Sequence, residues 1–202
     1  MDHAEIFDRI YATNFWKQGS GPGSTEEATR QYRVYLQNFL KTNNIRSVLD
    51  VGCGDWQFSQ YIDWSGIEYV GVDVSAVVLS NTRKFTRPGI AFRELNAVKD
   101  PLPQADLLIA KDVLQHWSNA DILAFIPKLT SFRNALITNG FNSAGMSNLN
   151  QDIVAGSWRP VDLRERPYHL PGSYVFWFDA GEPKSIYLWS NPNNQAMPAA
   201  SP

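Results

Sequence analysis

Two carboxylates and a glycine turn are spaced along the chain as a nucleoside-containing ligand would require. Asp50 lies in the apolar run Val48–Val51, which leads into the turn Gly52-Cys53-Gly54, and Asp73 lies at the end of a second apolar run. Glycines in such a turn allow the backbone to approach a ligand closely. In an open α/β sheet, ligands bind beyond the carboxyl ends of the strands. Because an acid at a strand end can accept hydrogen bonds from both hydroxyls of a ribose, the pattern predicts a ribose-containing ligand.

The spacing after the turn distinguishes two classes of cofactor. A dinucleotide fingerprint requires a third glycine three residues after Gly54, and that position is Gln57. This argues against a pyrophosphate site and makes a nucleotide-cofactor reductase the weaker alternative. A short glycine turn preceded by Asp50 suits an uncharged adenosine that carries a zwitterionic amino-acid tail.

A histidine and an aspartate further along the chain are the candidates for acid–base chemistry. His116 has an ordinary pKa near working pH and follows Asp112 by four residues, which places both on one side of a helical turn. We expect His116 and Asp112 to be the catalytic residues. The alternatives are that His116 packs beneath the site and bonds the backbone, and that Asp112 orients a loop. The sequence contains no Cys/His cluster with metal-ligand spacing, so no metal is expected.

Apolar runs of strand length alternate with amphipathic segments, which is typical of an α/β fold with a mostly parallel sheet. Two aromatic-rich runs near the end, joined by a turn that contains glycine, predict a hairpin. Strands are expected at 48–51, 68–74, 90–95, 105–111, 134–138, 174–178 and 185–189. Helices are expected at 26–41, 56–62, 75–84 and 119–129, with a short one near residues 6–11.

Helix starts and stops are marked by capping residues and proline. Ser24 or Thr25 is expected to cap the helix at 26–41, and Glu27 lies three residues after Ser24, as a capping box requires. Ser75 and Ser118 are expected to cap the next two helices, and Pro127 to cut the last one short.

Three segments in order carry a resemblance to a known family: VLDVGCGD at 48–55, VGVD at 70–73 and DLLIAKDVLQHW at 106–117. Together they resemble the class I S-adenosylmethionine-dependent methyltransferases of the small bacterial type. The resemblance implies a Rossmann-like methyltransferase fold, in which a mostly parallel seven-stranded sheet ends in an antiparallel hairpin. It implies S-adenosylmethionine as cofactor, and transfer of its methyl group to O or N of a small polar molecule by in-line displacement. A catalytically silent module that binds the cofactor for regulation is the second alternative.

The same resemblance assigns a set of cofactor-binding positions. Asp73 is expected to hold the ribose, Val74 to wall the adenine, and Lys111 to line the methionine side. At the end of the third strand the family often has an acid that bonds the adenine amino group. Asn96 stands there in this chain, and its amide oxygen can accept the same bond. The full expected set is Trp16, Asp50, Gly52, Cys53, Gly54, Asp73, Val74, Asn96, Ala97, Lys111 and Asp112.

Two segments outside the motifs are candidates for covering the site within a single domain at 1–191. Residues 1–25 end in GSGPGST, which is either a flexible linker or a lid, and the resemblance favours the lid. The long connection 139–173 is too rich in apolar and aromatic residues for a plain linker, and we expect it to cover the acceptor. Its alternative is a surface loop packed on its own side chains. The expected substrate-binding residues are Asn148, Asn150, Asp152, Trp158, Arg159 and Tyr168. Residues 192–202 are expected to be disordered.

The composition of the chain limits which kinds of partner and location are expected. The chain has 202 residues, a net charge of −2 and 44% hydrophobic residues, which fits one globular domain. Without a basic footprint, nucleic acid is a disfavoured partner, and a small-molecule acceptor is expected. The N-terminus lacks a signal peptide, no stretch has the length of a membrane span, and one cysteine cannot form an internal disulfide. A cytoplasmic location is therefore expected, and the oligomeric state is left open.

Overall fold

The computed structural model describes residues 2–141 and 148–193. Seven strands form one sheet in the order β3-β2-β1-β4-β5-β7-β6. The strands are β1 Ser47–Val51, β2 Glu68–Asp73, β3 Ile90–Glu94, β4 Leu107–Lys111, β5 Asn134–Gly140, β6 Ser173–Asp179 and β7 Pro183–Ser190. The first five run parallel, and β6 and β7 form an antiparallel hairpin attached to β5. The predicted fold class is confirmed.

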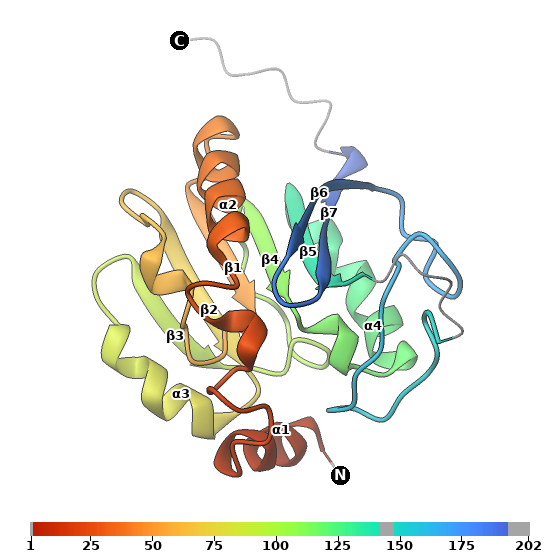
Figure 1. The fold of residues 1–202 in the computed structure, drawn as a ribbon. Coiled ribbons are helices and arrows are strands. Elements are labelled where there is room, and N and C mark those ends of the chain that lie inside the picture. Colours follow the sequence, from red (N-terminus) through yellow and green to blue (C-terminus); the bar gives the residue numbers. More distant parts are fainter. Residues whose placement is uncertain (1, 142–147, 194–202) are drawn as a thin grey trace.

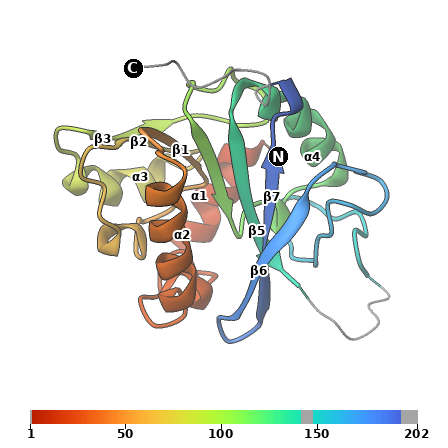
Figure 2. The ribbon, with the colours of Figure 1, turned by 90° about the horizontal axis from the view of Figure 1, so that it is seen from above.

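Helices cover both faces of this sheet. The α-helices are α1 His3–Ala12, α2 Arg30–Thr42, α3 Ala76–Thr82 and α4 Asn119–Phe125. The 3₁₀ turns are η1 Pro22–Ser24, η2 Ser59–Tyr61, η3 Arg83–Phe85, η4 Leu114–His116 and η5 Ile126–Ser131. Figure 2 shows α2 on one side of the sheet and α4 on the other, each packed on its own apolar core. The central strands therefore have buried side chains on both faces, as a parallel sheet requires.

Helix α1 lies beyond the carboxyl ends of the central strands (Figure 1). Asp8 accepts hydrogen bonds from Ser75 Oγ at 2.6 Å and from the Val77 amide at 3.1 Å, at the start of α3. At the other end of α1, His3 Nε2 lies 3.1 Å from the carboxylate of Asp121 in α4. Helix α1 thus contacts the start of α3, which follows β2, and the start of α4, which follows β4. Between them, at β1 and β4, the strand order reverses, and open α/β sheets bind ligands at such a point.

Two predicted helices differ from those in the structure. The capping box at Ser24 is wrong: its Oγ donates to the carbonyl of Ser20 at 3.2 Å, and α2 begins only at Arg30. The segment 56–62 contains only the 3₁₀ turn η2, because Trp56 has a φ of 60° and its side chain is buried against Tyr69. The two misses have different causes: Ser24 is engaged by a local bond within its own turn, whereas Trp56 is engaged by a contact between distant segments.

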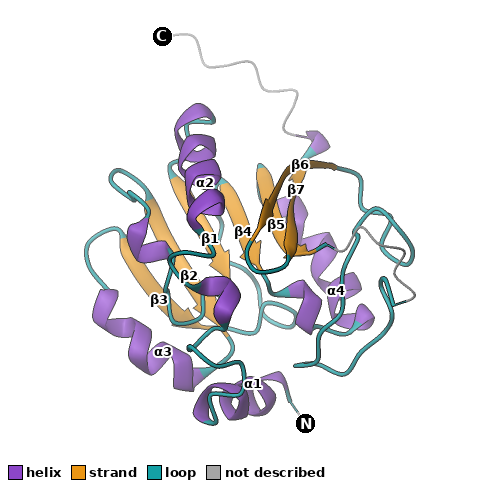
Figure 3. Cartoon of the chain, in the orientation of Figure 1, coloured by secondary structure: helices purple, strands orange, loops and turns teal. Residues whose placement is uncertain are grey.

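The other helix ends agree with the sequence. Ser75 caps α3 by accepting from the Val78 amide, and Ser118 forms a capping box with Asp121 at the start of α4. Helix α4 stops at Phe125, and Pro127 lies in the 3₁₀ turn that follows. Figure 3 shows that the described residues between β5 and β6 contain no helix or strand. Of the predicted tail, residues 194–202 lie outside the described residues.

Candidate active site

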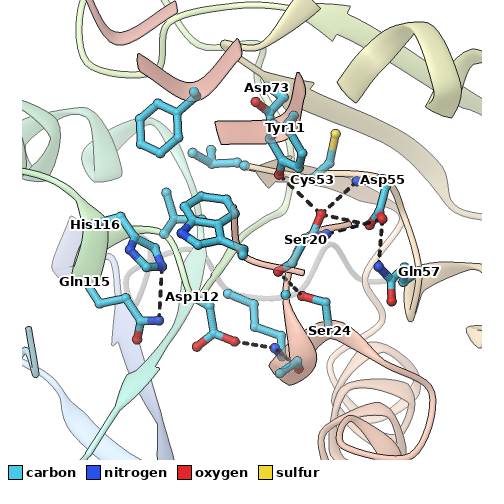
Figure 4. Close-up of a pocket in the computed structure, with 18 of the residues that line it drawn as sticks. Tyr11, Ser20, Ser24, Cys53, Asp55, Gln57, Asp73, Asp112, Gln115 and His116 are labelled. Atoms are coloured by element: carbon cyan, nitrogen blue, oxygen red, sulfur yellow. Dashed lines mark hydrogen bonds and ion pairs between the residues drawn. The ribbon is translucent and has the colours of Figure 1, made fainter. Parts of the chain in front are cut away.

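A cavity of about 540 Å³ opens at the carboxyl ends of β1, β2, β3 and β4. The segment that follows α1, the turn after β4 and the β6–β7 turn complete its wall, as the close-up in Figure 4 shows in part. Cavities of this size are typical of small-molecule and cofactor sites. Residues of the predicted site that line it are Trp16, Gly52, Cys53, Asp73, Val74, Asn96, Ala97, Lys111, Asp112, His116 and Trp158.

The carboxylate of Asp73 is held at the end of β2 by two backbone amides. Its Oδ2 accepts from the Gly54 amide and its Oδ1 from the Ser75 amide, each at 3.0 Å. Burial raises the pKa of Asp73 to about 6, and the amide donors limit that rise. Each carboxylate oxygen keeps a second lone pair, so the group can still accept hydrogen bonds from a diol.

The glycine turn between β1 and η2 brings the backbone to the cavity wall. Gly52 has a φ of 70°, and a Cβ there would lie 2.5 Å from the side chain of Val113. The amides of Gly52 and Cys53 both bond the carbonyl of Val72, at 2.8 and 3.1 Å. A residue with a side chain would therefore both strain the backbone and strike the turn after β4.

Asp50 and Gly54 support the cavity without lining it. Asp50 Oδ2 accepts from the hydroxyl of Tyr69 at 2.5 Å, on the α2 face of the sheet. Burial raises the pKa of Asp50 to about 7, although the Tyr69 hydroxyl opposes this rise. Gly54 acts through its amide on Asp73, and a Cβ at Gly54 would meet Ser20 Oγ at 2.2 Å.

At the end of β3, Asn96 lines the cavity, but its amide oxygen already has partners. Asn96 Oδ1 accepts from the Val98 amide at 3.0 Å and from the Lys99 amide at 3.2 Å. The oxygen predicted to bond adenine is thus engaged in closing the turn after the strand. Val74 and Ala97 line the same part of the cavity with apolar side chains.

The segment after α1 is fastened to the glycine turn by Ser20. Ser20 Oγ donates to Asp55 Oδ1 at 2.8 Å and accepts from the Asp55 amide at 3.0 Å. Figure 4 shows Ser20 between Tyr11 and Asp55, and its Oγ lies 3.2 Å from the Tyr11 hydroxyl. Trp16, in the same segment, lies with its ring centroid 4.9 Å from that of His116.

Four charged side chains form a cluster at the cavity wall: Lys111, Asp112, Glu182 and Lys184. The carboxylate of Asp112 lies 2.5 Å from Lys111 Nζ and 2.8 Å from Lys184 Nζ, and Lys184 also pairs with Glu182. Burial would raise the pKa of Asp112, but the two ammonium groups outweigh it and hold the pKa at about 2. Lys111 Nζ also donates to the carbonyl of Gly23 at 2.9 Å, which joins the segment after α1 to the cluster. Asp112 is thus a paired anion and a poor proton acceptor at neutral pH.

His116 faces the cavity from the 3₁₀ turn η4. Its Nδ1 lies 2.8 Å from the carbonyl oxygen of Ser157, and its Nε2 lies 3.4 Å from Gln115 Nε2. Burial lowers the pKa of His116, and the Ser157 carbonyl and the carboxylate of Asp112 oppose this shift. The expected helical relation to Asp112 is wrong, because Asp112 has a φ of 59°, yet both residues line the cavity.

Five of the six residues expected to bind substrate do not reach the cavity: Asn148, Asn150, Asp152, Arg159 and Tyr168. They hold the chain instead. Asn150 bonds the carbonyls of Asp162 and Arg166, and Asp152 accepts from the Asn119 amide. The buried guanidinium of Arg159 donates to the Leu114 carbonyl at 2.7 Å and to the Tyr168 hydroxyl at 3.0 Å. The described part of the loop is therefore held partly by its own side chains and partly by η4 and the start of α4, and Trp158 alone of the six lines the cavity.

Several lining residues were not predicted from the sequence. Glu182 comes from the β6–β7 turn and Lys184 from the start of β7, Gln115 precedes His116, and Ser20 lies in the glycine-rich segment. Gln115 lies inside the DVLQHW motif, and this position is the one feature of the sequence that could have marked it as a site residue. In the described parts of the chain, no group of three or more His, Cys, Asp and Glu side chains is placed to hold a metal ion. No helix in residues 2–141 and 148–193 is both long and apolar enough to cross a membrane.

Comparison with known proteins agrees with this geometry. Residues 48–133 match the family model of a methyltransferase domain. Human N-acetylserotonin methyltransferase in complex with SAM (S-adenosylmethionine) is 17% identical, with a TM-score of 0.58 over 93% of this chain and 59% of that chain. Magnesium protoporphyrin IX methyltransferase from Synechocystis PCC 6803, with bound SAH (S-adenosylhomocysteine), is 14% identical, with a TM-score of 0.65 over 93% and 98%. The methyltransferase domain of the bacterial protein CtHen1 is 15% identical, with a TM-score of 0.58 over 81% and 99%.

The chain thus spans 59% of the length of the human enzyme and nearly all of the Synechocystis one. At these identities the structural likeness concerns the fold, and the family model concerns residues 48–133. Residues 48–133 match the model of a methyltransferase domain, and the chain shares the Rossmann-like fold of the class I S-adenosylmethionine-dependent methyltransferases.

Proposed function

We propose that the protein transfers a methyl group from S-adenosylmethionine to O or N of a small molecule. The observation that carries this proposal is the carboxylate of Asp73, held by two amides at the end of β2 beside the Gly52 turn. The hydroxyls of a ribose need a hydrogen-bond acceptor of this kind. An adenosine without a pyrophosphate does not need the third glycine that Gln57 replaces. Two of the solved structures that share this fold contain SAM or SAH, which supports the same donor.

The donor supplies a methyl group on a sulfonium, which is already a good leaving group. The protein's task is therefore to align donor and acceptor and to manage the acceptor's proton. In this proposal Asp73 accepts from the ribose, and Val74 and Ala97 contact the adenine. The turn at Gly52 and Cys53 lets the backbone approach the donor closely. Lys111 lines the methionine side and keeps the lid segment in place through the Gly23 carbonyl.

His116 is the proposed general base for the acceptor. A half-buried imidazole with a lowered pKa is neutral at physiological pH, so it is ready to take a proton. Asp112 is proposed to act indirectly: its ion pairs hold the turn after β4, and with it the approach to His116. This replaces a direct proton-transfer role for Asp112, which its pKa of about 2 makes unfavourable.

The two covering segments belong to the same proposal. Residues 1–25 form the lid in this account, supported by the contacts of Ser20 with Asp55 and of Gly23 with Lys111. The loop 139–173 contributes Trp158 to the cavity wall, and the hydrogen bonds of Arg159 to Leu114, Asn119 and Tyr168 anchor the rest of its described part. A single domain at 1–191, a cytoplasmic location and the absence of a nucleic-acid partner stay predictions from the sequence.

Calorimetric titration tests the donor directly. The protein is titrated with S-adenosylmethionine, S-adenosylhomocysteine, NADH and NADPH under one set of conditions. We expect binding of the first two and none of the dinucleotides, because Gln57 stands where a pyrophosphate site needs glycine. Binding of a dinucleotide in place of S-adenosylmethionine would overturn the proposal.

A further inference from the structure

Gln115 and His116 are adjacent on η4, and both side chains line the cavity. Figure 4 shows the Gln115 amide and the His116 ring joined by one contact, between Gln115 Nε2 and His116 Nε2. Gln115 is 3% exposed, so its polar atoms have little access to water outside the cavity. A buried amide beside an imidazole limits what kind of acceptor atom can bind there.

The orientation of the Gln115 amide is fixed from the β5 side. The backbone amide of Gly140 donates to Gln115 Oε1 at 2.7 Å, which only the oxygen can accept. The backbone of Gln115 is held as well, since its amide donates to Asn139 Oδ1 at 3.2 Å. The NH₂ group of Gln115 is therefore the end that faces His116.

The tautomer of His116 is fixed from the other side. The carbonyl oxygen of Ser157, 2.8 Å from Nδ1, can only accept, so Nδ1 carries the hydrogen. Nε2 then has a lone pair, which agrees with the Gln115 NH₂ group beside it. The segment around Ser157 also holds the η4 backbone. The Gly156 amide donates to the His116 carbonyl at 2.9 Å, and the Arg159 amide donates to the Gln115 carbonyl at 3.2 Å.

We propose that Gln115 and His116 form a hydroxyl-recognition pair, and that the methyl acceptor is the oxygen of an aromatic hydroxyl. This rests on the proposed methyl transfer and specifies its acceptor. The two nitrogens are 3.4 Å apart, a long contact that lets both bond one oxygen at ordinary distances of about 2.9 Å. Gln115 donates to one lone pair of that oxygen, and His116 Nε2 accepts its proton.

The transfer step balances as follows. The hydroxyl proton passes to His116 Nε2, and a second oxygen lone pair forms the new O–C bond. The C–S bond breaks, with its electrons passing to sulfur. The products are a methyl ether, a neutral thioether and an imidazolium, which later returns its proton to solvent. No further oxidant, reductant or metal is needed.

An amine fits this pair poorly. A neutral amine nitrogen has one lone pair, and that lone pair must point at the methyl group during transfer. If an N–H of the amine also takes the lone pair of His116 Nε2, no acceptor remains for the Gln115 N–H, and a buried donor left without a partner costs about 1–3 kcal/mol. An oxygen nucleophile has a spare lone pair and avoids this cost.

Aromatic side chains flank the pair and favour a planar acceptor. The Trp16 ring stands 4.9 Å from the His116 ring, and the Trp158 ring lies against Gly140, where a Cβ would be 3.2 Å from it. The lowered pKa of His116 also makes it a weak base. It is therefore better matched to a phenol, with an ordinary pKa of about 10, than to an aliphatic alcohol.

Nitrogen NMR tests the pair without an acceptor. The protein is labelled with ¹⁵N-histidine and saturated with S-adenosylhomocysteine, and His116→Gln identifies the signal of His116 among the three histidines. We expect the Nδ1–H tautomer at neutral pH. In Gln115→Glu the new carboxylate should raise the pKa of His116 by about 1–2 units, whereas exposed Gln104→Glu should leave it unchanged. An Nε2–H tautomer in the unaltered protein, or no effect of Gln115→Glu, would overturn the pair.

The acceptor atom is tested with a labelled donor. S-adenosylmethionine with a ¹³C-methyl group is incubated with the protein and a small-molecule extract of the source organism, and the labelled products are resolved by two-dimensional NMR. Label on an aromatic oxygen supports the inference. Label on nitrogen or sulfur, or on no compound, overturns it. Calorimetric binding of the donor in the same preparation separates that result from failure of the proposed function, because loss of donor binding would overturn both.

Discussion

The ammonium group of Lys184 lies 2.8 Å from the carboxylate of Asp112, although 72 residues separate them along the chain. The contact joins the start of β7 to the turn after β4, and the Lys184 side chain is 1% exposed. Because Lys111 bonds both Asp112 and the Gly23 carbonyl, one cluster connects the hairpin, the sheet and the segment after α1.

Lys184→Met should destabilise the protein strongly. It leaves Asp112 buried with one cation in place of two, and breaking a buried pair costs about 3–5 kcal/mol. The matched control is Lys99→Met, which breaks the exposed pair with Asp2 and should cost about 1 kcal/mol or less. Urea unfolding of both variants measures the difference, and equal losses would contradict the account of the cluster.

The ion pairs of Asp112 should also make the free energy of unfolding depend on pH in acid. The folded pKa of Asp112, about 2, is below its ordinary value of 3.8, so its stabilising effect is complete above pH 4 and disappears as the pH falls toward 2. Asp112→Asn should lose that dependence. The free energy of unfolding, measured from pH 5 to pH 2, should fall more steeply in the unaltered protein than in the variant. Parallel curves would show that the ion pairs do not lower this pKa.

Binding of the donor should weaken in acid because of Asp73. Burial raises the pKa of Asp73 to about 6, so below that pH its carboxylate becomes protonated and accepts hydrogen bonds from a ribose less well. Titrations with S-adenosylhomocysteine from pH 8 to pH 5 should show affinity falling as the pH passes through about 6. Asp73→Asn should bind more weakly and show little change over this range. The same slope in both proteins would assign the titration to another group.

His116→Ala should lower the rate of methyl transfer far more than donor affinity. A general base typically contributes about 10²–10⁴-fold, and His116 is not among the residues proposed to hold the donor. In the unaltered protein, kcat should fall in acid only below pH 6.5, since burial lowers the pKa of His116. Single-turnover rates and donor affinity are measured on the same samples. A normal rate in the variant would leave His116 with the structural role that the sequence also allowed.

The parts of this molecule that could be predicted from the sequence depend on neighbours along the chain. The glycine turn after β1, Asp73 at the end of β2, and the caps Ser75 and Ser118 are all set by residues within one βα unit. Strand order followed from the resemblance, since the pattern of apolar runs alone does not fix which strands pair.

The parts that could not be predicted depend on contacts between distant segments. Asp112 was expected beside His116 on a helical turn, but it has a left-handed conformation and pairs with Lys111 and Lys184 in an ion cluster. Arg159 and Tyr168 offered charge and stacking surface in the sequence, yet their partners are Leu114 in η4 and Asn119 at the start of α4. The sequence shows which polar side chains a loop contains, but not whether they face the cavity or pack against neighbouring segments.

The most direct test of the central claim is the affinity of Asp73→Ala for S-adenosylmethionine, measured by calorimetry beside the unaltered protein. The control is Glu68→Ala, which removes an exposed carboxylate from the other end of β2. The account predicts that Asp73→Ala binds at least about tenfold more weakly, because a charged hydrogen bond contributes roughly 1.5–3 kcal/mol, while Glu68→Ala binds normally. Unchanged affinity in Asp73→Ala would contradict it.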